Sequence, residues 1–263
     1  MDIVDALGNI DIWTMGSDSG NLMRFTFDPA LEALPVWSPD AGTIAFFSLK
    51  GGPGNLYLKP VSGTGSAELR LALGNRVQPT EWSPDGRFVI LTALRKETSW
   101  DLLLLPNEVG SAPVPFLESK FDEREGQFSP SGGWVAYTSN ETGRTEVYVT
   151  SFSGGSVGSS GKWQVSSAGG SQPRRRRDGK EIFYLTSDNK LMVREVGLGK
   201  SLVLGPPVEL FQTRPREFVS ALDVYTYDVS PDGRRILVNS ALESAAPSPI
   251  SVVMDWAAEL EKR

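Results

Sequence analysis

The sequence predicts an all-β protein, a β-propeller built from four-stranded antiparallel blades. A short turn phrase recurs as WSPDAG (37–42), WSPDG (82–86), FSPSGG (128–133), RRRDGK (175–180) and VSPDGR (229–234). It repeats every 45, 46, 47 and 54 residues when aligned on Asp40, Asp85, Ser131, Asp178 and Asp232. A period in the forties that carries several short strands is typical of propeller blades, and the 3.6-residue apolar period of helical repeats is not found.

Each phrase is expected to turn the chain between the first and second strands of a blade. Proline presets φ for a turn, aspartate accepts hydrogen bonds from nearby backbone, and glycine adopts positive φ without strain. We therefore interpret the motif aspartates as fold-makers and not as ligands or catalysts. The bulky residue before the turn is expected to pack between adjacent sheets, at Trp37, Trp82, Phe128 and Val229.

The strands between the turns are β-branched and aromatic runs bounded by Gly, Pro, Asn, Asp and Ser. The second unit is predicted to have strands at 79–82, 87–94, 100–106 and 113–119. The third is predicted at 126–129, 134–139, 145–152 and 162–167, and the fourth at 172–175, 181–186, 190–196 and 207–212. Two glycine-rich stretches, 49–55 and 153–161, are interpreted as hairpin connections.

The two ends of the chain predict incomplete sheets. Residues 2–6, 10–15 and 22–27 predict three strands that lack a first strand and its turn. Residues 224–230, 234–240 and 250–256 predict three more strands, and 254–263 a tail or short helix. The simplest count is six blades in a single domain, 1–263, with the N-terminal blade incomplete. Terminal strands could close the ring, or a second chain could, which makes a homodimer an alternative.

Composition excludes several function classes. The 263 residues carry a net charge of −6 and contain neither histidine nor cysteine. A Ser-His-Asp triad, a His-ligated zinc, a disulfide and thiolate chemistry are therefore excluded. The acidic balance argues against a nucleic-acid partner. No signal peptide and no apolar stretch of about 20 residues is present, so we expect a cytoplasmic chain without a membrane segment.

Several phrases resemble known bacterial propellers. DIWTM, LMRFTFDP, PVWSPDAGTIAFFS and NLYLKPV resemble TolB-like, WD-like β-propeller repeats. WSPDGRFVILT, QFSPSGGWVAYTSNETGRTEVYVTSF and residues 162–196 more specifically resemble the C-terminal sensor propeller of bacterial membrane-anchored serine/threonine protein kinases. The resemblance runs from about residue 8 to residue 260 and implies a sensor or scaffold role. It also implies a periplasmic location if the chain is a fragment of such a kinase.

The chain departs from this family in several respects, two of which bear on function and packing. The kinase motifs are absent, with no glycine-rich loop, His-Arg-Asp or Asp-Phe-Gly, so this chain is not expected to phosphorylate a substrate. Arg175 stands where the family usually has an aromatic residue, which puts the packing of the fourth blade against its neighbour in question.

The candidate ligand-binding residues lie on the loops opposite the turns, the face that propellers commonly use for ligands. They are Arg76, Asp122, Glu123, Arg124, Asn140, Glu141, Arg144 and Arg216. The alternative is that 118–127 is a solvated charged loop, and that Asn140 serves a turn while Glu141 pairs with Arg144. The basic run at 173–180 could contact phosphates or could be a partly solvated strand.

Three functions follow from these observations. The first is a non-catalytic binding or sensor propeller that recognises a small molecule, glycan or protein at its channel mouth. The second is a carboxylate- or calcium-dependent hydrolase of the glycosidase or lactonase type, with Asp122, Glu123 and Glu141 as candidate acids. The third is a structural or assembly module. No cofactor is expected, apart from calcium in the second case.

Overall fold

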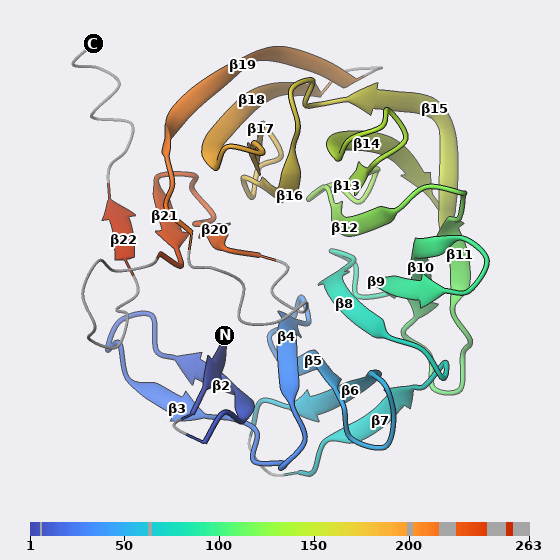
Figure 1. The fold of residues 1–263 in the computed structure, drawn as a ribbon, viewed down its shortest axis with the longest axis vertical. Coiled ribbons are helices and arrows are strands. Elements are labelled where there is room, and N and C mark those ends of the chain that lie inside the picture. Colours follow the sequence, from blue (N-terminus) through green and yellow to red (C-terminus); the bar gives the residue numbers. More distant parts are fainter. Residues whose placement is uncertain (6, 63–64, 199–201, 216–224, 241–250, 255–263) are drawn as a thin grey trace. The chain divides into compact units, whose positions relative to one another are not determined.

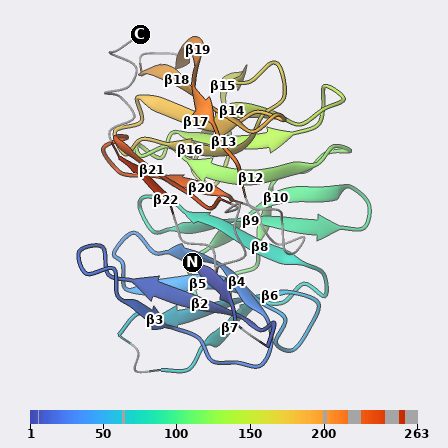
Figure 2. The ribbon, with the colours of Figure 1, turned by 60° about the vertical axis from the view of Figure 1, so that its left-hand side comes forward.

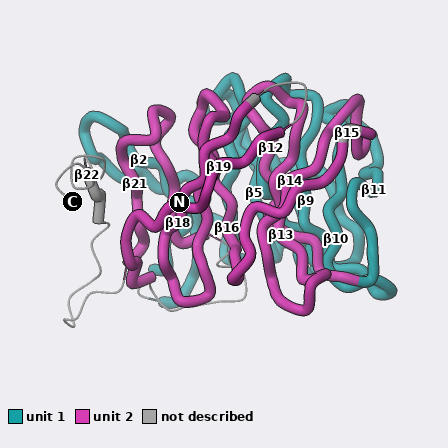
Figure 3. Tube along the Cα trace, turned by 90° about the horizontal axis from the view of Figure 1, so that it is seen from above, with its two compact units in different colours: residues 1–120 teal, residues 121–263 magenta. Residues whose placement is uncertain are grey.

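The fold is an all-β propeller of antiparallel sheets, seen in a computed structural model (Figure 1). The structure describes residues 1–5, 7–62, 65–198, 202–215, 225–240 and 251–254. These residues form strands and turns, and no helix occurs among them. The chain divides into two compact units, residues 1–120 and 121–263, coloured separately in Figure 3. Each unit is described by itself below.

Unit 1 contains three antiparallel sheets whose strands follow one another in chain order (Figures 1 and 2). The first sheet has three strands, β1 (Asp2–Val4), β2 (Ile10–Met15) and β3 (Leu22–Arg24). The second has four, β4 (Glu32–Trp37), β5 (Thr43–Ser48), β6 (Asn55–Pro60) and β7 (Glu68–Leu71). The third also has four, β8 (Val77–Trp82), β9 (Phe88–Arg95), β10 (Ser99–Pro106) and β11 (Val114–Leu117).

Unit 2 repeats this plan. Its first sheet has β12 (Glu123–Phe128), β13 (Trp134–Ser139), β14 (Glu146–Ser153) and β15 (Ser156–Gln164). The second has β16 (Ser171–Arg175), β17 (Glu181–Leu185), β18 (Lys190–Leu198) and β19 (Leu202–Gln212). The last has β20 (Tyr227–Val229), β21 (Arg235–Val238) and β22 (Ser251–Met254).

The predicted count of six blades is not confirmed. Five sheets carry a motif turn between their first and second strands, and these are the blades that the structure shows. The sheet β1–β3 lacks that first strand and its turn, as the sequence predicted, and does not count as a further blade. The predicted tail or helix at 254–263 lies outside the described residues beyond Met254.

Apolar side chains on both faces of the middle strands form the core between neighbouring sheets. In unit 1, Ala45 and Leu56 of one sheet cluster with Trp82 and Leu91 of the next. In unit 2, the second sheet packs its inner strands in the same way against the first, where one cluster joins Val147 to Ile182. A strand covered on both sides reads as a continuous apolar run, which is why these runs lack strict alternation.

The motif turns are held by a repeated set of hydrogen bonds. The serine hydroxyl donates to the aspartate Oδ1 over 2.5–2.6 Å, in the pairs Ser38–Asp40, Ser83–Asp85 and Ser230–Asp232. The same Oδ1 accepts the backbone N–H two residues later, from Gly42, Arg87 and Arg234. The Ser83 hydroxyl, followed by Arg87, lowers the pKa of Asp85 to about 2. The prediction that these aspartates build the fold is confirmed.

The first strand of each complete blade contains a break in register that the sequence analysis did not predict. Register shifts occur between Ala33 and Val36, Pro79 and Glu81, Arg124 and Gln127, and Ser171 and Arg174. At three of the breaks a non-glycine residue has positive φ, namely Leu34 (57°), Glu125 (59°) and Gln172 (56°). These are β-bulges, which bend a strand and re-aim the side chain at the bulge.

One predicted connection is wrong. The glycine-rich stretch 153–161 is mostly strand, because β14 ends at Ser153 and β15 begins at Ser156. Only Gly154 and Gly155 make the connection, and both adopt positive φ. The other glycine-rich stretch, 49–55, does connect two strands, β5 and β6, as predicted.

Candidate functional site

The first strands of the three sheets of unit 2 lie next to one another and share a polar network. In each sheet, one member of the network stands six positions before the aligned turn residue (Ser131, Asp178 or Asp232). These members are Glu125, Gln172 and Thr226. The Gln172 backbone N–H donates to Glu125 Oε2 over 2.6 Å. In the same way, the Thr226 N–H donates to Gln172 Oε1 over 2.7 Å, and the Thr226 hydroxyl donates to it over 3.1 Å. The side chain at each bulge therefore accepts a hydrogen bond from the backbone of the next sheet.

A second layer of the network lies two residues further along each first strand. Arg174 Nη1 donates to Gln127 Oε1 over 3.1 Å, and Arg174 Nε lies 3.3 Å from Asp228 Oδ1. The Arg174 guanidinium carbon stands 3.6 Å from the centre of the Tyr225 ring. The Arg174 side chain is 17% exposed and that of Asp228 67%. An arginine stacked on a tyrosine thus borders solvent beside an exposed carboxylate.

The bulges explain how the sequence places these groups. Left-handed backbone costs a non-glycine residue about 1 kcal/mol or more, so it persists only where other contacts hold it. At Glu125 and Gln172 those contacts are the bonds to the next sheet. Gln172 and Thr226 are buried, so an acceptor is required for the Thr226 N–H. The hydrogen bonds between the sheets therefore hold Glu125 and Gln172 in a strained backbone conformation, and that conformation in turn aims their side chains at the next sheet.

Glu125 titrates in an unusual range. Burial raises the pKa of Glu125 to about 7, although the Gln172 N–H and the charges of Arg124 and Arg174 oppose the rise. A carboxyl group with a pKa near neutrality can both donate and accept a proton under ordinary conditions. Burial also raises the pKa of Tyr227, whose hydroxyl donates to the Gln172 carbonyl oxygen over 2.8 Å.

The structure brings two of the predicted residues together beside the start of β12. The Asp122 N–H donates to Asn140 Oδ1 over 3.0 Å, and Asn140 Nδ2 donates back to Asp122 Oδ2 over 3.5 Å. Glu123 is buried at the start of the strand, and the Arg124 carbonyl oxygen accepts the Thr138 hydroxyl. Asn140 therefore ties the loop to the sheet.

The predicted pair Glu141–Arg144 is wrong. Glu141 pairs with Lys162 of β15, whose ammonium group also lies 4.6 Å from the centre of the Tyr148 ring. Arg144 pairs with the buried carboxylate of Glu146 over 2.5 Å. The two loop residues have separate partners because Arg144 is held by the buried Glu146, while Lys162 of β15 reaches Glu141 beside the Tyr148 ring.

The remaining predicted residues do not join this network. Arg76 belongs to unit 1, where its carbonyl oxygen accepts the Leu94 N–H over 2.9 Å. Arg216 lies outside the described residues. Across the described ranges, no three acidic side chains are grouped so that they could hold a metal ion. No helix long and apolar enough to cross a membrane occurs in that part of the chain either.

Gln127, Gln172 and Tyr225 were not predicted as site residues from the sequence, and Arg174 was predicted only as part of the basic run 173–180. A signal for Gln172, and for its neighbours Glu125 and Thr226 in the network, was present in the repeat. When the repeats are aligned, the position six before the turn residue reads Leu34, Pro79, Glu125, Gln172 and Thr226. Polar residues occupy it only in the last three units, at a place where the first two have apolar ones.

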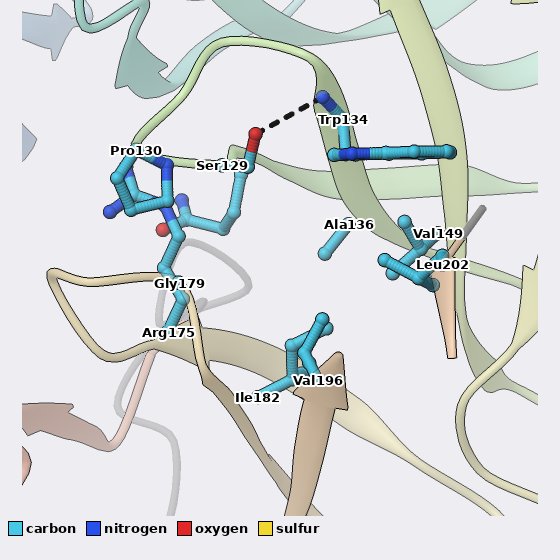
Figure 4. Close-up of a pocket in the computed structure, with 11 residues that line it drawn as sticks. Ser129, Pro130, Trp134, Ala136, Val149, Arg175, Gly179, Ile182, Val196 and Leu202 are labelled. Carbon is cyan, nitrogen blue, oxygen red and sulfur yellow. Dashed lines mark hydrogen bonds between the residues drawn. The ribbon is translucent and has the colours of Figure 1, made fainter. Parts of the chain in front are cut away.

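A small pocket lies between the first two sheets of unit 2 (Figure 4). Its volume is about 30 Å³, room for one or two water molecules. It is lined by Gln127, Ser129, Pro130, Trp134, Ala136, Val149, Arg175, Gly179, Ile182, Val196 and Leu202. Arg175 stands where Trp82 and Phe128 fill the equivalent place, and its Nε donates to the Phe128 carbonyl oxygen. The expected packing defect is present, and it is too small for a ligand.

Comparisons with known proteins agree with the fold. TolB from Acinetobacter baumannii superposes with a TM-score of 0.70 at 18% identity, over 94% of this chain and 57% of that one. An oligogalacturonate lyase in complex with manganese gives a TM-score of 0.65 at 14% identity, over 93% and 71% of the two chains. The structural neighbours are thus TolB-like and related β-propellers. At these identities the likeness shows the fold alone.

Sequence comparison finds a likeness over only part of the chain. An uncharacterized peptidase of Bacillus subtilis, YuxL, is 26% identical over 167 residues. That match covers 50% of this chain and 25% of the peptidase. The chain therefore spans about a quarter of the length of this relative. No protein-family model matches the chain.

Proposed function

We propose that this chain is a non-catalytic binding propeller that recognises a carboxylate-bearing small ligand, such as an acidic sugar, along the first strands of unit 2. The observation that carries the proposal is the stack of Arg174 on Tyr225 beside Gln127 and Asp228. Arginine and tyrosine dominate binding hot spots, and a guanidinium suits a carboxylate by its paired donors. Gln127 and the exposed Asp228 would serve hydroxyl groups of the same ligand.

We further propose that recognition serves a sensor role within a longer protein. The resemblance to the C-terminal propeller of bacterial membrane-anchored kinases supports this, as does the partial coverage of the relatives. In such a protein the propeller would be periplasmic, and the ligand signal would pass to a domain outside this chain.

The test is calorimetric titration with a galacturonic acid trimer and, as the uncharged comparison, a galactose trimer. We expect the acidic sugar to bind, and Arg174→Gln to weaken it at least tenfold. Arg87→Gln is the matched control, since Arg87 is an exposed arginine of a motif turn in unit 1 and should leave affinity within twofold. Equal binding by Arg174→Gln, or no binding of the acidic sugar, would overturn the proposed ligand class and site.

A second function is favoured by one specific observation, the pKa of about 7 at Glu125. This is the range expected of a general acid or base, and the neighbours include an oligogalacturonate lyase. In this alternative Glu125 would transfer the proton and Arg174 would hold the substrate carboxylate. Turnover of oligogalacturonate, lost in Glu125→Gln with binding retained, would favour the enzyme. Equal rates for the two proteins would remove it.

A further inference from the structure

Two motif turns of unit 2 meet to form one surface, which we call the turn pair (residues 176–181 and 230–235). The Arg177 N–H donates to the Pro231 carbonyl oxygen over 3.1 Å. Gly233 lies so close to the other turn that a Cβ there would stand 2.7 Å from Arg176 Cδ. Its φ of +74° also favours glycine. The two turns are therefore fixed against each other and present their side chains together.

The turn pair exposes four cations, Arg177, Lys180, Arg234 and Arg235. In the part of the chain that the structure describes, none of the four makes an ion pair within 4.0 Å. The three acids of the turn pair, Asp178, Glu181 and Asp232, each already have an ion pair or hydrogen bond within it. Arg176 pairs with Asp178 over 2.7 Å and with Glu181 over 3.1 Å. Asp232 accepts the Ser230 hydroxyl and the Arg234 N–H. The surface is therefore basic in a chain whose net charge is −6.

The chemistry of the turn pair selects among anionic partners. A lipid surface is held by basic residues together with inserted apolar ones, and Pro231 is the single apolar side chain in these twelve positions. Single-stranded nucleic acid needs aromatic platforms, and the turn pair has none. An extended polyanion such as duplex DNA would also bring charge near the rest of an acidic molecule. A short run of carboxylates, by contrast, is short enough to contact the four cations without lying against the acidic rest of the molecule.

We propose that the turn pair is a docking site for an acidic protein segment, one rich in Asp and Glu. Three of its four cations are arginines, whose forked donors bind carboxylates in pairs. The site is distinct from the first-strand network in both position and partner, and it does not depend on the function proposed above. Rim charges of this kind set the rate and salt dependence of association more than the final affinity.

The test is fluorescence anisotropy with a labelled octaglutamate peptide, and with octaglutamine as its uncharged counterpart, at low and at physiological salt. We expect octaglutamate alone to bind, more weakly as salt rises. Arg177→Gln combined with Arg234→Gln should weaken it at least tenfold. The backbone N–H groups of residues 177 and 234, which hold the turns, remain in this variant. A thermal melt checks its folding. Lys96→Gln, which removes an exposed cation of unit 1, should change affinity less than twofold.

Two results would overturn the docking site. One is the absence of salt-dependent octaglutamate binding by the wild-type protein. The other is an equal loss in the Lys96→Gln control and the double variant, which would mean that net charge and not the turn pair governs binding. Duplex DNA and phosphatidylserine vesicles are run in parallel. Tighter binding of either, lost in the double variant, would replace the acidic protein segment with that class of partner.

Discussion

At the scale of single residues, Glu125 combines a strained backbone with a displaced titration. The Glu125 carboxylate accepts a hydrogen bond from the Gln172 backbone N–H, and in the same way the Gln172 carboxamide accepts one from the Thr226 N–H. A carboxamide can therefore replace it without losing the acceptor. What the carboxamide cannot do is ionise, and this difference separates the contribution of the charge from that of the hydrogen bond.

We predict that Glu125→Gln changes how stability depends on pH. The folded pKa of Glu125 is about 7, above the ordinary value of 4.5, so between these values the folded state holds a proton that the unfolded chain has released. The free energy of unfolding of the wild type should therefore fall as pH rises from 4.5 to 7, by about 3 kcal/mol relative to the variant. Urea unfolding at several pH values measures this. Parallel pH curves for the two proteins would contradict it.

The turn aspartates show what the sequence predicts well at this scale. Their hydrogen bonds are local, two residues long, and depend only on residue types that the phrase states. The Glu125–Gln172 bond joins residues that are 47 apart, with no local signature for the positive φ. The chemistry of Glu125 was therefore out of reach of reasoning from short phrases.

At the scale of elements, strands and their order followed from the repeat, while bulges and sheet-to-sheet contacts did not. Strand limits such as those of β9 or β13 agree with the apolar runs because turn residues bound them. The glycine-rich start of β15 was wrongly predicted as a connection, because pairing with β14 overrides the weak strand preference of Gly and Ser. The network across β12, β16 and β20 needs side-chain directions that only the bulges set.

We predict that Gln172→Leu destabilises the protein by about 1–3 kcal/mol, because it leaves the buried Thr226 N–H without its acceptor. The measurement is the urea midpoint at constant m-value. Gln164→Leu is the control, since Gln164 is exposed on β15 and should change stability by less than about 0.5 kcal/mol. Equal effects of the two substitutions would contradict a role for the sheet-to-sheet bond.

We also predict that Arg175→Phe stabilises unit 2 by about 1 kcal/mol. The aromatic ring would fill the pocket beside Trp134 and Ile182, as Phe128 and Trp82 do in their own sheets. The loss of the bond from Arg175 to the Phe128 carbonyl oxygen opposes part of this gain. Thermal unfolding compares the variant with wild type. A lower melting temperature would show that the arginine, not the missing ring, is what this position requires.

At the scale of the whole molecule, two sets of carboxyl groups act on stability in opposite directions. Hydrogen bonds and nearby cations lower the pKa of the first set, Asp28, Asp40, Asp85, Asp178, Asp188 and Asp232. Burial raises the pKa of the second set, Glu32, Asp101, Glu125 and Glu181. The first set stabilises the fold above about pH 4 and the second destabilises it above that range.

We therefore predict a maximum of stability between about pH 4 and 4.5. As pH falls from about 4 to 2, the first set becomes protonated and its contribution is lost. As pH rises from about 4.5 to 7, the second set must ionise against burial. Melting temperatures from pH 2.5 to 8 measure both limbs. A flat profile between pH 2.5 and 4 would contradict the role assigned to the turn aspartates, and Asp85→Asn should make that limb shallower.

The spacing between bulge and turn bears on how such a chain can change in length over evolutionary time. Positions 34, 79, 125, 172 and 226 each stand six residues before the turn residue, although successive turns are 45 to 54 residues apart. In the blades whose first strand contains a register shift, the differences in repeat length therefore lie outside the segment from bulge to turn. A single-residue deletion within it would shift the bulge acceptor away from the neighbouring sheet. Changes in length elsewhere in a blade would leave this spacing, and the contact that depends on it, in place.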